Sequence, residues 1–160
     1  MTRFLTAIAL CTILFSSFAQ TEDTSFQIVG IWQEDLPMIA SGWSTNYQFF
    51  EDGRVNYNHN QMDCGDSIIT ESGTYTFKKR VVKIKFDSMT LISGGTLQKS
   101  TGSCGSEYEI VGGEITTQKY RAKTKFRITQ AAPLDDYDYL DRIIIQEVNW
   151  FRMAHNPEDY

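Results

Sequence analysis

The sequence predicts an all-β fold, an antiparallel up-and-down barrel of about eight strands. Three observations predict it. Apolar and polar residues alternate with a period of two through most of the chain after residue 25. Turn signals containing Gly, Asp or Asn separate short runs of β-branched and aromatic residues, and no helix-length amphipathic segment lies between them. Because that many consecutive antiparallel strands leave exposed edges unless the sheet closes, we expect a barrel.

The composition indicates a single ordinary domain. The chain has 160 residues, 41% of them hydrophobic, with 15 Lys and Arg against 20 Asp and Glu. A domain of this length buries enough surface to fold without a metal or a disulfide. Its net acidic charge argues against a nucleic-acid partner.

Residues 1–19 have the pattern of a secretory signal peptide. A cationic start precedes an apolar run from Phe4 to Phe15, and the small residues Ser17 and Ala19 precede the expected cleavage point. The apolar run is too short to span a bilayer, so we expect no integral membrane segment after its removal. The predicted protein is secreted or periplasmic. The expected divisions are a linker at 20–25, a barrel domain at 26–153 and a tail at 154–160.

Alternation defines five strands in the first half of the chain. Glu51-Asp52-Gly53-Arg54 predicts a tight hairpin between the second and third strands, since Asp-Gly readily adopts the positive φ of primed turns. The fourth strand is entered at Gly73. The residues expected to face inward are, strand by strand, Phe26, Ile28 and Trp32; Trp43, Tyr47 and Phe49; Val55, Tyr57 and His59; Tyr75 and Phe77; Val82, Ile84 and Phe86.

The second half is dominated by a basic strand at Thr117–Ile128. Ser88–Ser106, rich in Gly, Ser and Thr, predicts only a short strand at Thr90–Ile92 and then a flexible loop. Gly112-Gly113 predicts a hairpin joining Tyr108–Val111 to the basic strand. One parity of that strand carries Lys119, Arg121, Lys123, Lys125 and Arg127, and the other carries Tyr120, Ala122, Phe126 and Ile128.

We expect a last strand at Arg142–Arg152. Its inward residues are predicted to be Ile144, Val148 and Trp150. It is expected to pair with the basic strand, so that Asp141 and Glu147 offset the cations there.

Cys64 and Cys104 remain as an even pair after removal of the signal peptide, and both lie in turn-like contexts. In an oxidising compartment such a pair predicts a disulfide. On the chain-entropy model, closing a loop of about 40 residues stabilises the fold by roughly 4 kcal/mol. Two separate exposed thiols are the alternative. Zinc is a weaker one, because neither Cys belongs to a CxxC pair.

Three short motifs carry a family resemblance. Gly30-Ile31-Trp32, Phe49-Phe50-Glu51-Asp52-Gly53 and Gly73-Thr74-Tyr75-Thr76-Phe77 resemble the small secreted lipocalin-like, calycin-type proteins of bacteria. The resemblance implies that Trp32 closes one end of the barrel and that Arg152, from the last strand, packs on its ring as a structural cap. Unlike the larger ligand-carrying lipocalins, the chain has an acidic loop at Ala131–Asp141 where they have a helix.

The predicted interior is rich in aromatic residues, which leaves two functions open. The first is a pocket at the open end of the barrel for a small apolar or amphipathic ligand. The second is a filled barrel that acts as a protein interaction or inhibitor module through its outer loops, Ser88–Ser106 and Ala131–Asp141. The candidate ligand-binding residues are Trp43, Tyr47, Tyr57, His59, Tyr75 and Tyr120.

Catalytic, metal and cofactor chemistry receive little support. The chain has no nucleophile elbow, zinc-protease helix, phosphate loop or dinucleotide fingerprint, so neither an enzyme nor a cofactor is expected. His59 alone is a weak metal signal, and nothing in the sequence brings His155 to it. Asp135–Asp141 gathers four carboxylates but lacks the Gly and closing Glu of a calcium loop, so a solvated acidic loop is expected.

Overall fold

A computed structural model describes residues 26–35, 37–38, 42–102 and 104–160. The predicted signal peptide at 1–19 and linker at 20–25 lie outside the described residues. The strands are β1 (Gly30–Glu34), β2 (Asn46–Phe49), β3 (Arg54–Asn58), β4 (Ile68–Lys78), β5 (Val81–Ser93), β6 (Thr96–Lys99), β7 (Tyr108–Val111), β8 (Glu114–Ala131), β9 (Arg142–Ile145) and β10 (Val148–Ala154). Two 3-10 helices, η1 (Asp135–Tyr137) and η2 (Pro157–Asp159), complete the described chain. Within it, no helix is both long enough and apolar enough to cross a bilayer.

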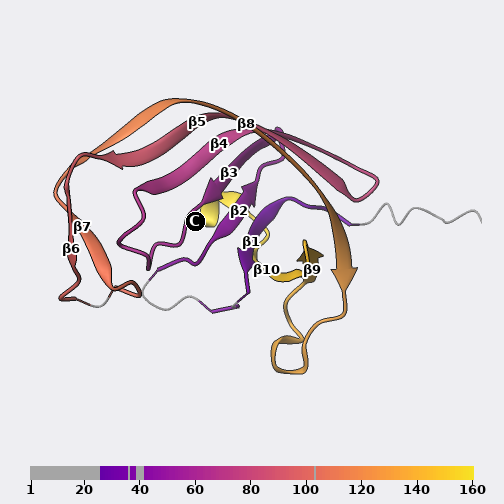
Figure 1. The fold of residues 1–160 in the computed structure, drawn as a ribbon. Coiled ribbons are helices and arrows are strands. Elements are labelled where there is room, and N and C mark those ends of the chain that lie inside the picture. Colours follow the sequence, from indigo (N-terminus) through magenta and orange to yellow (C-terminus); the bar gives the residue numbers. More distant parts are fainter. Residues whose placement is uncertain (1–25, 36, 39–41, 103) are drawn as a thin grey trace, which may run out of the picture.

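Eight strands form a closed antiparallel barrel in the order β1-β10-β9-β8-β5-β4-β3-β2 (Figure 1). Barrel neighbours are consecutive in sequence except at two places. One is the closure between β1 and β10, and the other is between β5 and β8, where β6 and β7 leave to form a separate two-stranded sheet. The ring closes through β1, where Trp32 is in register with Tyr47 of β2 and Arg152 of β10. The predicted all-β, up-and-down barrel is therefore confirmed.

The core fills the part of the barrel nearest the β2–β3 hairpin. Along β5, Val82, Ile84 and Phe86 are buried while the intervening Lys83 and Lys85 are exposed, as the alternation predicts. We call the end of the barrel nearest the β2–β3 hairpin the closed end. The opposite end, where β3 stops at Asn58, is the open end. The buried core cluster consists of Ile28, Trp32, Tyr47, Phe49, Val55, Val82, Ile84, Phe86, Phe126, Ile128, Ile143, Ile145 and Trp150.

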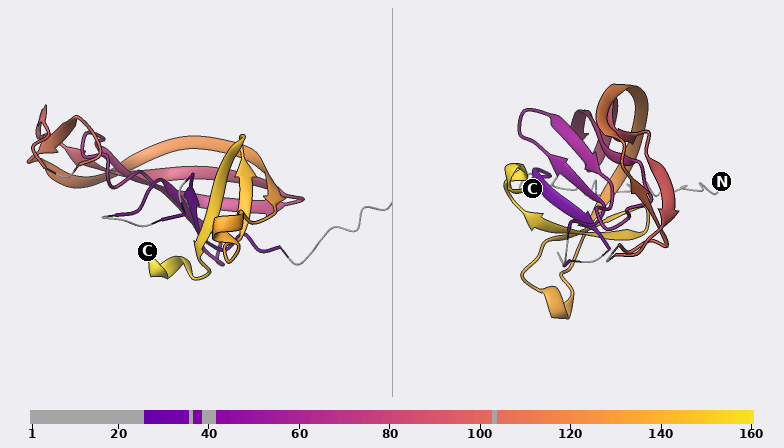
Figure 2. Two further views of the ribbon diagram at one scale, coloured as in Figure 1. Left: turned by 90° about the horizontal axis from the view of Figure 1, so that it is seen from below. Right: turned by 90° about the vertical axis from the view of Figure 1, so that its left-hand side faces the viewer.

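β5 and β8 extend far past the barrel and carry the β6–β7 sheet at their distal ends (Figure 2). β5 continues without interruption through Thr90–Ile92 to Ser93, and β6 follows after two residues. The expectation of a short strand followed by a flexible loop is therefore wrong in this region. The long β5–β8 pairing supplies the cross-strand neighbours that the Gly-, Ser- and Thr-rich sequence does not reveal.

Two Gly-Gly corners separate the long strands from the β6–β7 sheet. Gly94, Gly95, Gly112 and Gly113 all have φ between 77° and 88°, which favours glycine. A Cβ on Gly113 would lie 2.8 Å from Cγ2 of Ile92 on the opposing strand. Because β7 pairs with β6 and not with β8, the predicted Gly112-Gly113 hairpin is instead a corner.

The segment Arg142–Arg152 is two strands, not one. β9 and β10 form a hairpin whose turn residues, Gln146 and Glu147, both have positive φ. Val148 and Trp150 pack on the core as predicted, but the inward residues of β9 are Ile143 and Ile145. The expectation for Ile144 is wrong because the turn shifts the parity between the two strands.

The predicted charge offset along β8 is also absent. β9 pairs with β8 only over Ile128–Ala131, beyond the basic stretch. Glu147 lies in the exposed β9–β10 turn. Asp141 instead approaches Arg152, with 3.4 Å between Oδ2 and Nε.

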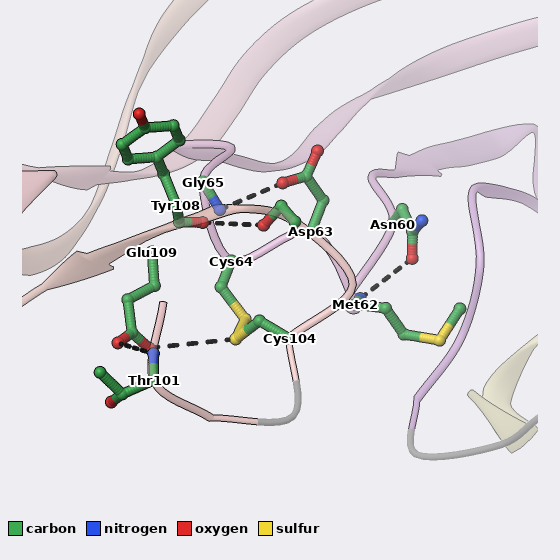
Figure 3. Close-up of a disulfide and its surroundings, with 10 residues drawn as sticks. Asn60, Met62, Asp63, Cys64, Gly65, Thr101, Cys104, Tyr108 and Glu109 are labelled. Atoms are coloured by element: carbon green, nitrogen blue, oxygen red, sulfur yellow. Dashed lines mark hydrogen bonds between the residues drawn. A yellow bond between two sulfur atoms is a disulfide. The ribbon is translucent and has the colours of Figure 1, made fainter. Parts of the chain in front are cut away.

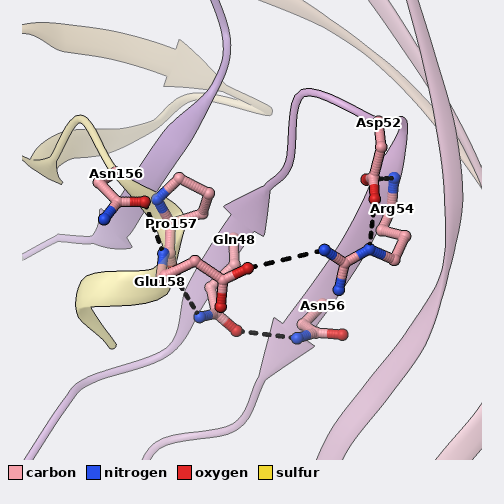
Figure 4. A network of polar contacts seen from close by, with 7 residues as sticks. All are labelled: Gln48, Asp52, Arg54, Asn56, Asn156, Pro157 and Glu158. Atoms are coloured by element: carbon pink, nitrogen blue, oxygen red, sulfur yellow. Dashed lines mark hydrogen bonds and ion pairs between the residues drawn. The ribbon is translucent and has the colours of Figure 1, made fainter.

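The C-terminal residues, expected as a tail, fold back onto the outer face of β2 and β3. Nε2 of Gln48 donates to the carbonyl oxygen of Pro157 at 2.8 Å, and the polar network around this contact is shown in Figure 4. The ring of Tyr160 packs 5.3 Å from that of Trp43. The acidic segment Ala131–Asp141 forms a projecting loop that contains η1 (Figure 1).

Cys64 and Cys104 form the predicted disulfide, with 5.9 Å between their Cα atoms (Figure 3). The bond joins the β3–β4 loop to the β6–β7 loop. Backbone hydrogen bonds reinforce the junction, since the Ile110 amide donates to the Cys64 carbonyl oxygen and the Gly105 amide donates to that of Met62, both at 2.8 Å. The β6–β7 sheet is thereby fixed to the barrel at a second point besides its glycine corners.

Candidate functional site

The inner face of the barrel changes character between its two ends. Strand register places Tyr57, Glu71, Met89 and Gln118 directly opposite one another in succession across β3, β4, β5 and β8. Residues directly opposite share a face, and Tyr57 packs on the core, so the whole series faces inward. Unlike the buried core below it, every member is half-buried or exposed. The concave face at the open end is therefore accessible.

A row of aromatic rings forms the boundary between core and open end. The Tyr47 ring is central, with its centroid 5.1 Å from that of Trp150 and 4.7 Å from that of Tyr57. The His59 ring continues the row, 5.3 Å from Tyr57. We call Trp150, Tyr47, Tyr57 and His59 the inner row. Tyr47 is 9% exposed and also contacts Phe49 and Phe126, so it joins the inner row to the buried core.

His59 lies between two carboxylates at one end of the inner row. Nδ1 is 2.9 Å from Oδ2 of Asp66, and Nε2 is 3.7 Å from Oε1 of Glu71. Nε2 is buried and has no hydrogen-bond partner among the described residues. The distance to Glu71 is too long for a hydrogen bond, so this ring nitrogen is left unsatisfied.

The other end of the inner row has the same two features. Nε1 of Trp150 is buried and finds no hydrogen-bond acceptor in the described part of the chain. Glu34 of β1 lies opposite Trp150 in register and therefore on the inner face. A carboxylate and an unsatisfied ring nitrogen thus occur at both ends of the row.

The two carboxylates act on the tyrosines between them. Burial, with contributions from Glu34, Glu71 and Asp66, raises the pKa of Tyr57 to about 12. Burial, with contributions from Tyr57, Glu71 and Glu34, also raises the pKa of Tyr47 above its ordinary value. Both hydroxyls therefore remain protonated at neutral pH in a locally negative environment.

The structure brings together only some of the predicted ligand-binding residues. Tyr47, Tyr57 and His59 belong to the inner row. Tyr120 is half-buried on β8 and packs against the edge of the core. Tyr75 lies at the closed end, where its hydroxyl donates to the Phe50 carbonyl oxygen at 2.9 Å.

Trp43 was predicted to face inward and does not. Trp43 precedes β2, and its ring packs outside the barrel on that of Tyr160. The inward–outward alternation of β2 therefore does not extend back to Trp43. The sequence interpretation in turn omitted Glu34 and Trp150 from the site. Glu34 follows Trp32 by two residues on the same strand, so its side chain is expected on the same inner face. This alternation would have identified Glu34 from the sequence.

The predicted cap residues meet at the closed end. The guanidinium carbon of Arg152 lies 4.6 Å from the centroid of the Trp32 ring. Nε1 of Trp32 donates to the Ile28 carbonyl oxygen at 2.7 Å. This end of the barrel is packed, whereas the inner face at the open end is accessible.

A cleft of about 530 Å³ lies outside the barrel, between the β2–β3 hairpin and the C-terminal residues. Its cation, Arg54, is already engaged, with Nε 2.6 Å from Asp52 and Nη2 3.6 Å from Glu158. The described residues contain no group of three or more His, Cys, Asp or Glu side chains placed to hold a metal ion, and this includes the loop Asp135–Asp141.

Comparisons with protein-family models, with curated proteins and with solved structures found no match to this chain.

Proposed function

We propose that the protein binds a small amphipathic molecule at the open end of the barrel, with the polar end of the ligand seated on the inner row. The observation that carries the proposal is the pair of buried, unsatisfied ring nitrogens, His59 Nε2 and Trp150 Nε1. Glu71 lies 3.7 Å from the first, and Glu34 is opposite Trp150 in strand register. Buried polar atoms are normally satisfied, and a bound ligand is one means of satisfying them.

The chemistry of His59 favours a hydrogen-bond donor on the ligand. When the Nδ1 proton is directed at Asp66, Nε2 of the neutral imidazole is an acceptor. It faces Glu71 Oε1, a second acceptor, across 3.7 Å. A protonated amine that reaches both atoms from the open end donates to both, and the ring of Tyr57, 5.3 Å from that of His59, favours a cation there.

The half-buried inner face above the row suits the apolar part of the ligand. Met89, Leu91 and Tyr120 contribute apolar surface that the core does not cover. Covering such surface with an alkyl or aromatic group contributes about 25 cal/mol for each Å² removed from water.

The proposal extends to family and location. A closed barrel with an aromatic interior supports the resemblance to small secreted lipocalin-like proteins. The Cys64–Cys104 disulfide supports a secreted or periplasmic location, since such bonds persist in oxidising compartments.

Three probes with the same alkyl chain test the ligand class: dodecylamine, dodecanol and dodecanoate, each added below its micelle concentration. Tyr and Trp fluorescence and calorimetry measure binding. We expect the amine to bind at least about tenfold more tightly than the carboxylate, which corresponds to about 1.4 kcal/mol. Absence of binding by all three probes contradicts the proposal.

Matched carboxylate variants locate the site. Glu71→Gln should weaken dodecylamine binding by about tenfold or more, because a charge-assisted hydrogen bond contributes about 1.5–3 kcal/mol. Glu114→Gln removes one exposed carboxylate at the distal end of β8 and should leave the affinity unchanged. Equal affinities in the two variants would exclude Glu71 from the site.

The second candidate is a filled-barrel protein interaction or inhibitor module. The buried Tyr47 layer favours it, as do four exposed apolar side chains on or near the β6–β7 sheet. They are Leu97, Tyr108, Val111 and Ile115, which are 47% to 73% exposed. Native mass spectrometry of the protein from its own host separates the candidates. A co-purified small-molecule mass supports ligand binding, whereas apo protein with a partner that is lost in Leu97→Ser/Ile115→Ser supports the module.

A further inference from the structure

The outer surface of β5 and β8 carries a concentrated array of cations. Seven exposed side chains project from it, and we call this surface the cationic face. They are Lys83, Lys85, Lys119, Arg121, Lys123, Lys125 and Arg127. They make up seven of the 15 Lys and Arg of a chain whose net charge is −5, so the rest of the protein is strongly acidic.

Strand register sets like charges directly against each other on this face. Lys83 lies opposite Lys125, and Lys85 lies opposite Lys123. Directly opposed like charges destabilise a sheet. On the other side of β5 the neighbours are Thr76 and Thr74 of β4, which supply no carboxylate.

No other part of the described chain neutralises the cationic face. None of its seven members forms an ion pair with a carboxylate of the described residues. β8 has a strand partner only on its β5 side until Ile128, where β9 begins to pair. Asp87, at the bulge in β5, is the nearest acidic residue in sequence, and its carboxylate accepts a hydrogen bond from Ser88.

From this charge pattern we infer that the cationic face binds a linear acidic polysaccharide. The cations on β8 alternate along one strand, so they are spaced by about 6.8 Å and extend over about 27 Å. The β5 lysines widen this line to a band two cations across. A flexible chain with carboxylate or sulfate groups at regular intervals can follow such a band and relieve the repulsion between the paired lysines.

The outward residues that accompany the cations distinguish this partner from other polyanions. They include four threonines, Thr74, Thr76, Thr117 and Thr129, whose hydroxyls suit the hydroxyl groups of sugars. The cationic face presents no aromatic ring on which bases of single-stranded nucleic acid would stack. It also lacks the Trp, Phe and Leu side chains that insert into a bilayer interface.

Heparin, which carries both uronate and sulfate groups, is the probe. Affinity for a fluorescent heparin oligosaccharide is measured between 20 and about 300 mM salt. The variant Lys83→Gln/Lys85→Gln/Lys123→Gln/Lys125→Gln should bind at least about tenfold more weakly at the lowest salt, with a shallower dependence on salt because fewer counterions are released. Its melting temperature should not fall, since two like-charge pairs are removed. If the fourfold variant does not fold, it is replaced by the single Gln variants. Their heparin affinity, its dependence on salt and their melting temperature are measured in the same way.

Matched controls test the site and the partner class. Lys99→Gln removes a lysine of β6, off the cationic face, and should change heparin affinity less than Lys123→Gln does. Equal effects of the two substitutions, or full heparin affinity in the fourfold variant, overturn the inference. Equal or tighter binding of an oligothymidylate of matched charge, or of phosphatidylglycerol vesicles, overturns the assignment to a polysaccharide. Aggregation of the fourfold variant with unchanged heparin affinity would identify the lysines as protection of an edge strand instead.

Discussion

Arg152 covers the ring of Trp32 at the closed end of the barrel, with 4.6 Å between the guanidinium carbon and the ring centroid. The Arg152 side chain is 9% exposed, and it also donates to the Gln27 carbonyl oxygen and to Nδ1 of His155. One side chain from the last strand therefore ties together β1, the residues that precede it and the start of the C-terminal segment.

Arg152→Ala should lower the free energy of unfolding by about 2 kcal/mol, because it removes both a cation–π contact and a charged donor to the Gln27 carbonyl oxygen. Thermal unfolding and Trp emission measure the effect, and the emission should shift. Arg54→Ala is the matched control, since Arg54 stacks on Phe50 at 4.3 Å but is largely exposed. Equal changes in melting temperature for Arg152→Ala and Arg54→Ala would show that the contact with Trp32 does not contribute to stability.

Loss of the disulfide should loosen the β6–β7 sheet more than the barrel. The bond joins two loops away from the core, so Cys64→Ser/Cys104→Ser should increase amide exchange over residues 96–111 while Val82–Phe86 stays protected. The expected global loss is up to roughly 4 kcal/mol on the chain-entropy model. Hydrogen-exchange mass spectrometry provides the comparison, and uniform exchange across both regions would contradict it. The non-reduced parent should titrate no free thiol.

Gly73→Ala should be severely destabilising. A Cβ on Gly73, which lies opposite the bulge in β5, would be 2.1 Å from the Lys85 carbonyl oxygen and 2.7 Å from Cα of Phe86, so the β4–β5 ladder must separate. We expect a loss of about 3 kcal/mol or more, measured by denaturant unfolding. Gly102→Ala is the control, because a Cβ there meets nothing within 4 Å. Similar unfolding midpoints for the two variants would show that β4 tolerates the side chain.

Glu34 should make stability depend on pH. Burial, with a smaller contribution from Asp35, raises the pKa of Glu34 above its ordinary value of 4.5. The folded state therefore binds this proton more tightly than the unfolded state, and stability falls as pH rises from 4.5 through the raised pKa. Glu34→Gln removes this loss.

Thermal unfolding of apo Glu34→Gln and of the parent, compared from pH 4 to 7, measures that effect. The melting temperature of the variant should increase relative to that of the parent as pH rises, by no more than about 3 °C at pH 7. Glu114→Gln, at an exposed position, should show no such trend. A difference between Glu34→Gln and the parent that does not change with pH would rule out the raised pKa.

The local pattern was sufficient for the strands and for much of the core. Val82, Ile84 and Phe86 alternate with lysines, and Asp52-Gly53 marks the first hairpin, because both signals depend only on neighbouring residues. Within the candidate site, the same alternation found Tyr47, Tyr57 and His59. It did not find Trp150 as a site residue, because its unsatisfied nitrogen is a property of the surrounding residues and not of the sequence around it.

The sequence by itself determined that the chain forms alternating strands, which faces are apolar, and which two cysteines pair. Only the tertiary structure decided that β7 pairs with β6, that Trp43 lies outside while Tyr47 fills the barrel, and that the cations of β8 form no ion pair with a carboxylate of the described residues. The physical reason is that alternation is set by the backbone of one strand, whereas the partner of a strand and the cover of its face come from residues distant in the chain.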